Sequence, residues 1–270
     1  MTRSISFLSD YGVADEFAGV CRAVIARIAP EATVIDISHG VPRHDVSLGA
    51  EMLARALPFT PAGVHLAVVD PGVGSERRAV AVRLAEDDRL LVGPDNGLLA
   101  DAIEAFGGAV EAAEVSRSPV CLKPVSATFH GRDVFAPVAA HLALGATLDA
   151  VGEPLDPGRL VRLERPPARV APGTALSAVV GSVDQFGNAS LNASAAEAAA
   201  AGLALGAEIA IDVSGSSHLA RFARTFADVD EGELLVYLTS SNALALGVNR
   251  GSGAERLGLG TGAEVVLRTT

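Results

Sequence analysis

Two short segments hold the residue types that could do acid/base chemistry. The first, VVDPGVGSERR at residues 68–78, follows an apolar, β-rich run and places Asp70 just beyond it, ahead of a glycine loop and Arg77. The second, FHGRD at residues 129–133, places His130 at the start of a helical pattern. A carboxylate, a guanidinium and an imidazole on separate elements can together orient water and move a proton.

Each of these residues also has an ordinary structural interpretation. Asp70 before Pro71 is a favoured turn start, and paired arginines such as Arg77 and Arg78 usually lie on a solvated hairpin. His130 could begin a helix or sit satisfied in a core. Taken singly, the residues favour these readings over catalysis.

The surrounding elements predict where the three side chains meet. Alternating apolar runs and helical periods predict an α/β layered domain, in which ligands bind at the carboxyl ends of strands. The expected strands cover residues 4–9, 33–37, 65–69, 79–84 and 90–92, and the expected helices cover residues 17–28 (with Asp15 as N-cap), 46–57, 98–106 and 134–144. Asp10 and Asp70 then follow two of these strands.

The pattern changes after residue 152. Five prolines punctuate a stretch without a long period, which we interpret as a linker. Short apolar runs at residues 175–183, 207–213, 234–238, 244–248 and 264–267 follow, with an alanine-rich helical segment at 193–205. They predict a smaller, all-β, barrel-like domain, giving an α/β domain at 1–165 and a β domain at 166–270.

Composition narrows the class of partner. The 270 residues carry a formal net charge of −11, which disfavours a nucleic-acid partner. No apolar run is long enough to span a bilayer, and the amino terminus lacks a secretory apolar core. Cys21, on the apolar face of the first helix, and Cys121, on an expected short strand, are interpreted as reduced packing residues. We therefore expect a cytoplasmic protein, with no metal site because no zinc-spaced His/Cys cluster occurs.

Several turns offer polar groups to a ligand. Asp10 could accept two hydrogen bonds from a ribose diol or simply begin a turn, and the loop around Asn96 is first of all a turn. The hairpin at residues 184–188 offers a carboxylate (Asp184), an aromatic face (Phe186) and an amide (Asn188). A further probable hairpin turn contains Ser240. A dinucleotide site is rejected because residues 72–74 lack the third glycine and no helix follows.

Taken together, these segments resemble the S-adenosyl-L-methionine hydroxide adenosyltransferases, the group that also includes the fluorinase and chlorinase. The resemblance covers nearly the whole chain. It is carried by FLSDYG at residues 7–12, VIDISHGVPRHDV at 34–46, the two segments above, and the turns at 93–97, 184–188 and 240–242.

The resemblance implies a role for each candidate residue. Asp70, Arg77 and His130 match the catalytic set of the hydrolase branch, with Arg78 the less favoured member, and Asp10 matches the residue that holds the ribose hydroxyls. Contacts to substrate at the remaining positions are implied for Asn96, for Phe186 and Asn188 (adenine), and for Asp184 and Ser240 (methionine). The family also implies a homotrimer with substrate bound between subunits.

The same resemblance separates the branches. Halogenases carry tyrosine where Asp70 stands, threonine where Val73 stands, and no histidine at position 130. His44 departs from the fluorinase, which has an aromatic that packs on the ribose. The chain therefore has the hydrolase set, and the expected reaction is hydrolysis of S-adenosyl-L-methionine to adenosine and L-methionine without a cofactor.

Physical chemistry restricts how water is activated. Full proton transfer from water, of pKa about 15.7, would cost on the order of 16 kcal/mol to an ordinary aspartate and roughly 12 kcal/mol to histidine. We therefore expect Asp70 to orient water, the proton to pass toward His130, and Arg77 to stabilise developing hydroxide. Two other classes remain open, a non-catalytic sensor of S-adenosylmethionine or adenosine and a metal hydrolase using Asp10, Asp70 and His130.

Overall fold

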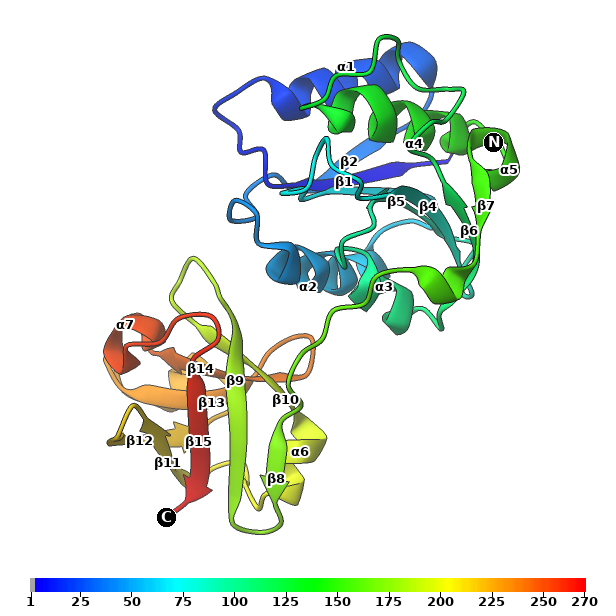
Figure 1. Cartoon of the computed structure of the whole chain (residues 1–270). Coiled ribbons are helices and arrows are strands. Elements are labelled where there is room, and N and C mark those ends of the chain that lie inside the picture. Colours follow the sequence, from blue (N-terminus) through cyan, green and yellow to red (C-terminus); the bar gives the residue numbers. More distant parts are fainter. Residues whose placement is uncertain (1–2) are drawn as a thin grey trace. The chain divides into compact units, whose positions relative to one another are not determined.

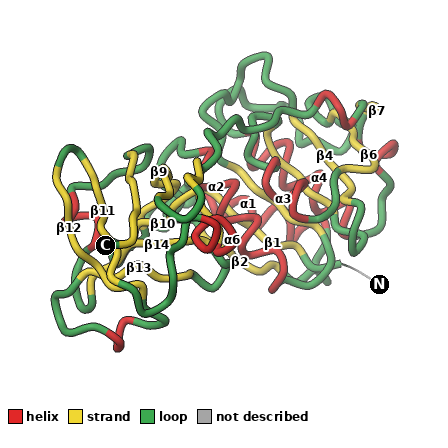
Figure 2. The backbone as a smooth tube through the Cα atoms, turned by 90° about the horizontal axis from the view of Figure 1, so that it is seen from below, coloured by secondary structure: helices red, strands yellow, loops and turns green. Residues whose placement is uncertain are grey.

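The computed structural model describes residues 3–270 and divides the chain into two compact units, one ending at Glu164 and the other comprising Arg165–Thr270. Each unit has its own buried apolar core. The first is α/β and the second is almost entirely β (Figures 1 and 2), so the predicted fold class is confirmed.

The first unit is built on a seven-stranded mixed sheet in the order β2-β1-β3-β5-β4-β6-β7. The strands are β1 (Ile5–Ser9), β2 (Val34–Ser38), β3 (Val64–Val68), β4 (Ala79–Leu84), β5 (Leu90–Pro94), β6 (Ala109–Glu114) and β7 (Glu153–Leu155). β2, β1, β3 and β5 are parallel, whereas β4, β6 and β7 join by antiparallel pairing. The parallel strands are the part of the sheet that positions the site.

Helices cover both faces of this sheet (Figure 1). The helices are α1 (Phe17–Ile28), α2 (Val46–Ala56), α3 (Ala100–Ala105), α4 (Ala136–Ala143) and α5 (Leu148–Val151). α1, α4 and α5 pack on one face around Phe7 and Phe135, and α2 and α3 pack on the other around Leu8 and Leu53. Because β1 alternates its side chains between the two cores, both layers fix the strand that ends beside Asp10.

The second unit is a closed barrel of seven strands. Its strands are β8 (Arg169–Ala171), β9 (Ala175–Val183), β10 (Ala189–Ser194), β11 (Glu208–Val213), β12 (Ser216–Phe222), β13 (Leu234–Leu238), β14 (Ala243–Val248) and β15 (Glu264–Thr269), with short helices α6 (Ala195–Ala200) and α7 (Gly253–Leu257). Pairing of β9 with both β15 and β10 closes the ring, and β8 joins outside it at β9. Burial alternates along β9 and β11, as expected for strands with one face on a core, and the sequence predicted these strands from short apolar runs between turns.

Several details of the sequence prediction are wrong. Glu16, not Asp15, is the residue before α1, and no side chain caps that helix. Cys121 is buried but lies in a loop, not in a strand. Five strands were not predicted, namely β6, β7, β8, β10 and β12. β6 is alanine- and glutamate-rich, which conceals its strand period, and β7 is only three residues long, inside the stretch interpreted as linker.

Candidate active site

The three expected catalytic residues meet at the carboxyl edge of the parallel strands. Asp70 follows β3, Arg77 lies in the loop before β4, and His130 precedes a π-helical turn at Gly131–Phe135 that runs into α4. Arg77 joins the other two, since its Nε donates to Asp70 Oδ1 at 3.0 Å, its Nη2 donates to Asp70 Oδ2, and Nη2 is also 3.3 Å from His130 Nδ1.

Local chemistry explains how the two loops come together. Gly74 has a positive φ of 79°, and a Cβ there would lie 2.4 Å from the carbonyl oxygen of Ala127, three residues before His130. Only glycine therefore allows the Asp70–Arg77 loop to approach the His130 loop so closely. Pro137 has no N–H, so the carbonyl of Asp133 is free to accept from Leu122 N at 2.9 Å, which ties the loop at Leu122 to the π-helical turn at Gly131–Phe135.

Arg77 is held in a nearly dry environment. The side chains of Arg77 and Asp70 are only 8% and 6% exposed, and the guanidinium lies over the Phe135 ring, 5.4 Å from its centre. Arg78, by contrast, pairs with Asp95 and donates to the carbonyl of Arg159. The structure therefore brings Arg77, and not Arg78, together with Asp70 and His130.

Burial shifts the two titratable groups in opposite directions. Desolvation raises the pKa of Asp70 above its usual 3.8, although the charge and hydrogen bonds of Arg77 act against this. Desolvation, followed by the positive charge of Arg77, lowers the pKa of His130 below 6.5, with the charge of Asp70 opposing. The lowered pKa keeps the His130 imidazole neutral at pH 7, and the two hydrogen bonds from the Arg77 guanidinium favour the carboxylate form of Asp70.

The hydrogen bond from Arg77 also fixes the tautomer of His130. A guanidinium can only donate, so His130 Nδ1 is the acceptor and the imidazole proton is on Nε2. His130 can thus take a proton at Nδ1 only after Arg77 releases that nitrogen. This arrangement differs from the sequence-based expectation that the proton passes toward His130.

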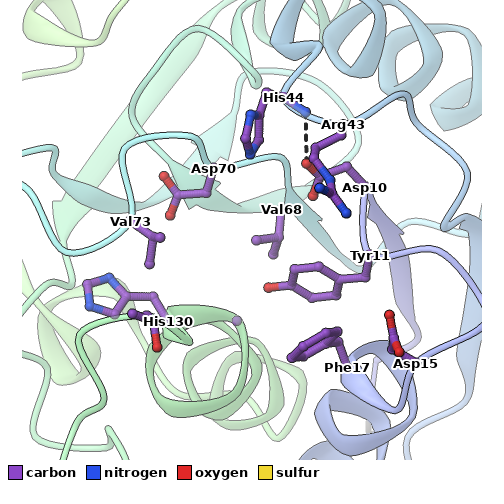
Figure 3. A pocket seen from close by; sticks show the side chains of 12 residues that line it. Asp10, Tyr11, Asp15, Phe17, Arg43, His44, Val68, Asp70, Val73 and His130 are labelled. Carbon is purple, nitrogen blue, oxygen red and sulfur yellow. Dashed lines mark hydrogen bonds between the residues drawn. The ribbon is translucent and has the colours of Figure 1, made fainter.

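Asp70 and His130 line a pocket of about 210 Å³ (Figure 3). Asp10 lies across from them, and its Oδ2 accepts from the backbone N–H of His44 at 3.0 Å. The other lining residues are Tyr11, Asp15, Phe17, Arg43, His44, Val68, Val73, Thr128 and Gly131. Asp10, Asp70 and His130 therefore share one cavity, as the sequence predicted.

Tyr11, Phe17 and Arg43 were not expected in this pocket. Tyr11 points its hydroxyl toward the space bounded by Val73 and His130 (Figure 3), and burial raises its pKa, so the hydroxyl stays neutral. A Cβ on Gly131 would lie 2.0 Å from that hydroxyl oxygen, so a larger residue there would displace Tyr11. In the sequence, the only indication that Tyr11 and Arg43 belong to the site is that they lie within the motifs at residues 7–12 and 34–46.

Asn96 lies outside the pocket lining. Its amide nitrogen donates to the carbonyl of Val69 at 2.9 Å, and its oxygen accepts from Leu98 N at 3.1 Å. Asn96 therefore braces the residue that precedes Asp70, which fits the turn interpretation. A direct contact with a ligand stays a prediction.

The remaining candidates lie in the second unit. Asp184 Oδ1 accepts from the backbone of Phe186 and Asn188, and its Oδ2 accepts from the Asn188 side chain at 2.8 Å, so the expected hairpin turn is confirmed. The Phe186 ring is 69% exposed. The sequence analysis did not single out Tyr237. Burial raises the pKa of its phenol, and the negative charge of Asp184 raises it further.

Ser240 is separated from this hairpin within one chain. Ala189 pairs with Leu246 near the carboxyl end of β14, whereas Ser240 lies in the turn before the amino end of that strand. Asp184 and Ser240 therefore lie toward opposite ends of β14. The predicted turn at residues 240–242 is present, with Asn242 in the left-handed region at φ 63°.

Comparisons with known proteins show which family the chain resembles over nearly its whole length. The SAM hydroxide adenosyltransferase N-terminal and C-terminal domain models match residues 5–152 and 178–266. A protein of Salinispora tropica named (R)-S-adenosyl-L-methionine hydrolase is 48% identical over 96% of this chain and 95% of its own length. A fluorinase of an Actinoplanes species is 30% identical over 91% of this chain and 90% of its own.

A solved structure extends the likeness to three dimensions. The crystal structure of a conserved protein from Thermotoga maritima superposes with a TM-score of 0.91 at 36% identity, and the match covers 98% of this chain and 99% of that one. Both units of the fold, and not only the catalytic loops, are therefore shared. On these matches the chain belongs to the SAM hydroxide adenosyltransferase family.

Proposed function

We propose that this protein hydrolyses S-adenosyl-L-methionine to adenosine and L-methionine by attack of water on the ribose C5′. The observation that carries the proposal is that Arg77 joins Asp70 to His130, and that Asp70 and His130 line a pocket that also holds Asp10. A pure sensor would need the pocket but not a desolvated carboxylate paired with arginine. Relatives at 40–48% identity over nearly the full chain are named as hydrolases of this substrate.

The leaving group makes water activation the main task. A sulfonium departs as neutral thioether, so no general acid is required for its expulsion. Hydrolysis converts the sulfonium and water into adenosine, methionine and one proton. Because the water oxygen becomes a strong acid as its bond to carbon forms, Asp70 can accept the proton late, without free hydroxide ever forming. Its raised pKa makes the carboxylate a better base for this step.

Arg77 and His130 act in this scheme by orientation and charge. Arg77 holds both oxygens of Asp70, which leaves lone pairs of the carboxylate to hold water. His130 fixes the other side of Arg77. A protonated His130 would repel the cationic sulfonium. Because His130 stays neutral, the site avoids this repulsion.

The assignment of binding residues is part of the same proposal. Asp10 would take the ribose hydroxyls, Phe186 and Asn188 the adenine, and Asp184 and Ser240 the methionine group, with Asn96 bracing the loop or touching the ligand. The pocket of about 210 Å³ is smaller than the roughly 300–1,000 Å³ of typical ligand sites. The substrate therefore needs further protein surface, which supports a homotrimer with sites completed between subunits.

We further propose that the reaction needs no metal or other cofactor and takes place in the cytoplasm. Among residues 3–270, no group of three or more His, Cys, Asp or Glu is placed to hold a metal ion. Both cysteines are buried as free thiols, which suits a reducing compartment. No helix within that range is long and apolar enough to cross a membrane.

The deciding experiment is incubation of the purified protein with S-adenosyl-L-methionine, with and without a chelator, followed by chromatography. The expected products are adenosine and methionine in equal amounts, at a rate the chelator leaves unchanged. Tight binding without turnover would instead identify a sensor, and loss of activity on chelation would identify a metal hydrolase.

A further inference from the structure

Asp36, His39 and Ser9 form a hydrogen-bonded set that is separate from Asp70, Arg77 and His130. His39 follows β2, and its Nδ1 is 2.7 Å from the hydroxyl of Ser9, the last residue of β1. Its Nε2 is 3.2 Å from Asp36 Oδ1. Ser9 and His39 are buried, and neither lines the pocket, so this set does not act on substrate directly.

The hydrogen bonds from Asp36 to Tyr11 each have a defined donor and acceptor. A carboxylate only accepts, so His39 carries its proton on Nε2 and donates it to Asp36. Nδ1 is then the acceptor, and the Ser9 hydroxyl donates to it. That leaves the Ser9 oxygen free to accept from the backbone N–H of Tyr11 at 3.3 Å. Every group from Asp36 to the Tyr11 amide is thereby satisfied.

His39 also reaches the far side of Asp10. Its backbone carbonyl accepts from Gly12 N at 2.7 Å, while its ring holds Ser9. Gly12 is in the left-handed region, at φ 71°, and turns the chain toward His39. The two residues between these attachments are Asp10 and Tyr11, both of which project into the pocket (Figure 3).

We propose that the Asp36, His39 and Ser9 chain is the positioning device for Asp10 and Tyr11, with His39 clamping the pocket loop on both sides. The inference rests on the proposed function, because it assigns the clamp to substrate binding. The hydrogen bonds of His39 go to Ser9, Asp36 and Gly12 and not to Asp70, Arg77 or His130, so loosening the clamp should weaken binding more than it slows the chemical step. A preorganised loop binds more tightly because less ordering accompanies binding.

The test compares two variants of equal shape. Ser9→Thr retains the hydroxyl, and Ser9→Val replaces it with a methyl, so any difference between them reports the hydrogen bond alone. Relative to Ser9→Thr, Ser9→Val should raise the KM for S-adenosylmethionine and the Kd for adenosine about tenfold, the effect of one lost buried hydrogen bond, while kcat changes less.

The same strand supplies a matched control. Ser6 is also buried in β1 and bonds a histidine, His65 Nδ1, at 2.8 Å, but neither residue lines the pocket. Ser6→Val should lower the melting temperature as Ser9→Val does and leave KM at its wild-type value. Equal KM for Ser9→Val and Ser9→Thr, or an equal rise in KM for Ser6→Val, would refute the positioning role.

A measurement on the wild-type protein tests the proposal even if the variants fail to fold. Side-chain ¹⁵N chemical shifts of His39 should show a protonated Nε2 and an unprotonated Nδ1, and the opposite tautomer would overturn the proposal. If wild-type protein binds adenosine but does not turn over S-adenosylmethionine, the hydrolase function fails while the Kd comparison still decides the clamp.

Discussion

Arg77 donates to Nδ1 of His130 across 3.3 Å and simultaneously holds both oxygens of Asp70. A fourth N–H, on Nη1, goes to the carbonyl of Arg78 at 2.9 Å. Since guanidinium has five N–H groups, these four bonds leave Arg77 little capacity to bind hydroxide itself. In the proposed mechanism Arg77 therefore orients Asp70 and sets the charge state of the site.

This arrangement makes Asp70 the residue on which turnover depends most. Asp70→Asn keeps the shape but removes the negative charge that orients water and accepts its proton. We expect kcat to fall by roughly 10²-fold or more, the range for a positioned acid/base group, with a smaller change in KM. Glu76→Gln, an exposed change in the same loop, should leave kcat unaltered. Wild-type kcat in Asp70→Asn would return Asp70 to the role of a turn residue.

The two neighbouring arginines should respond differently to the same substitution. Lysine cannot reproduce the fork that joins Asp70 to His130, so Arg77→Lys should lower kcat at least about tenfold. Arg78→Lys weakens the pair with Asp95, whose side chain is 3% exposed, and should lower the melting temperature with kcat largely kept. Steady-state kinetics and thermal unfolding on both variants check this. The reverse pattern would mean that the wrong arginine has been placed in the site.

The pKa shifts predict how activity falls in acid. The active form holds Asp70 ionised and His130 neutral. The pKa of Asp70 is raised above 3.8, so the carboxylate is lost earlier than usual as pH falls, and that of His130 is lowered below 6.5, so its protonation comes later. We therefore expect kcat/KM to be flat above about pH 6.5 and to decline between that value and pH 3.8. A decline centred above pH 6.5 would contradict the lowered pKa of His130.

A trimer with shared sites predicts complementation between inactive variants. Asp10→Ala removes the proposed ribose contact in the first unit, and Asp184→Ala removes the proposed methionine contact in the second. Each alone should be inactive, but a mixture after subunit exchange should regain part of the wild-type rate, because some sites then combine two intact halves. Size-exclusion chromatography with light scattering measures the assembly. A fully active monomer would refute the arrangement, and two Asp10 variants mixed together provide the control.

The strand pattern predicted where Asp10 and Asp70 lie, because each of them follows a strand. Asp10 and Asp70 come directly after apolar, β-rich runs, and parallel pairing of β1 with β3 brings such positions to one edge. His130 needed the resemblance, because the fastening at Gly74 and Ala127 is a contact between distant segments that no local pattern encodes. The tautomer of His130 likewise depends on where one guanidinium nitrogen lies.

Other misses share this physical origin. The Ser9 and His39 bond joins β1 to the segment after β2, and in sequence His39 is one polar residue among several. The register of β10 on β14 likewise places Asp184 and Ser240 toward opposite ends of β14 within one chain, which no local pattern predicts. Strand register determines which residues of neighbouring strands lie side by side, and the packing of the whole barrel sets that register.

Two features of the site, its charge and its hydrogen-bond donors, bear on halide chemistry. A bare carboxylate at position 70 would repel an anion 4 Å away by about 4 kcal/mol at an effective dielectric of about 20. Pairing with Arg77 offsets part of that repulsion. What remains decisive is the supply of donors, because a dehydrated halide needs several hydrogen bonds.

The neutral hydroxyl donors that line the pocket are those of Tyr11 and Thr128, and the groups nearest Asp70 add little to them. Four of the five N–H groups of Arg77 are engaged, Val73 is apolar, and Gly131 has only its backbone. We therefore expect chloride and fluoride to yield no 5′-halo-5′-deoxyadenosine from S-adenosylmethionine. The reverse reaction is the more sensitive measurement, and 5′-chloro-5′-deoxyadenosine with methionine should give no S-adenosylmethionine by chromatography. Product above a no-enzyme control would show that Asp70 and its partners tolerate a halide, and would place this chain between the hydrolase and halogenase branches.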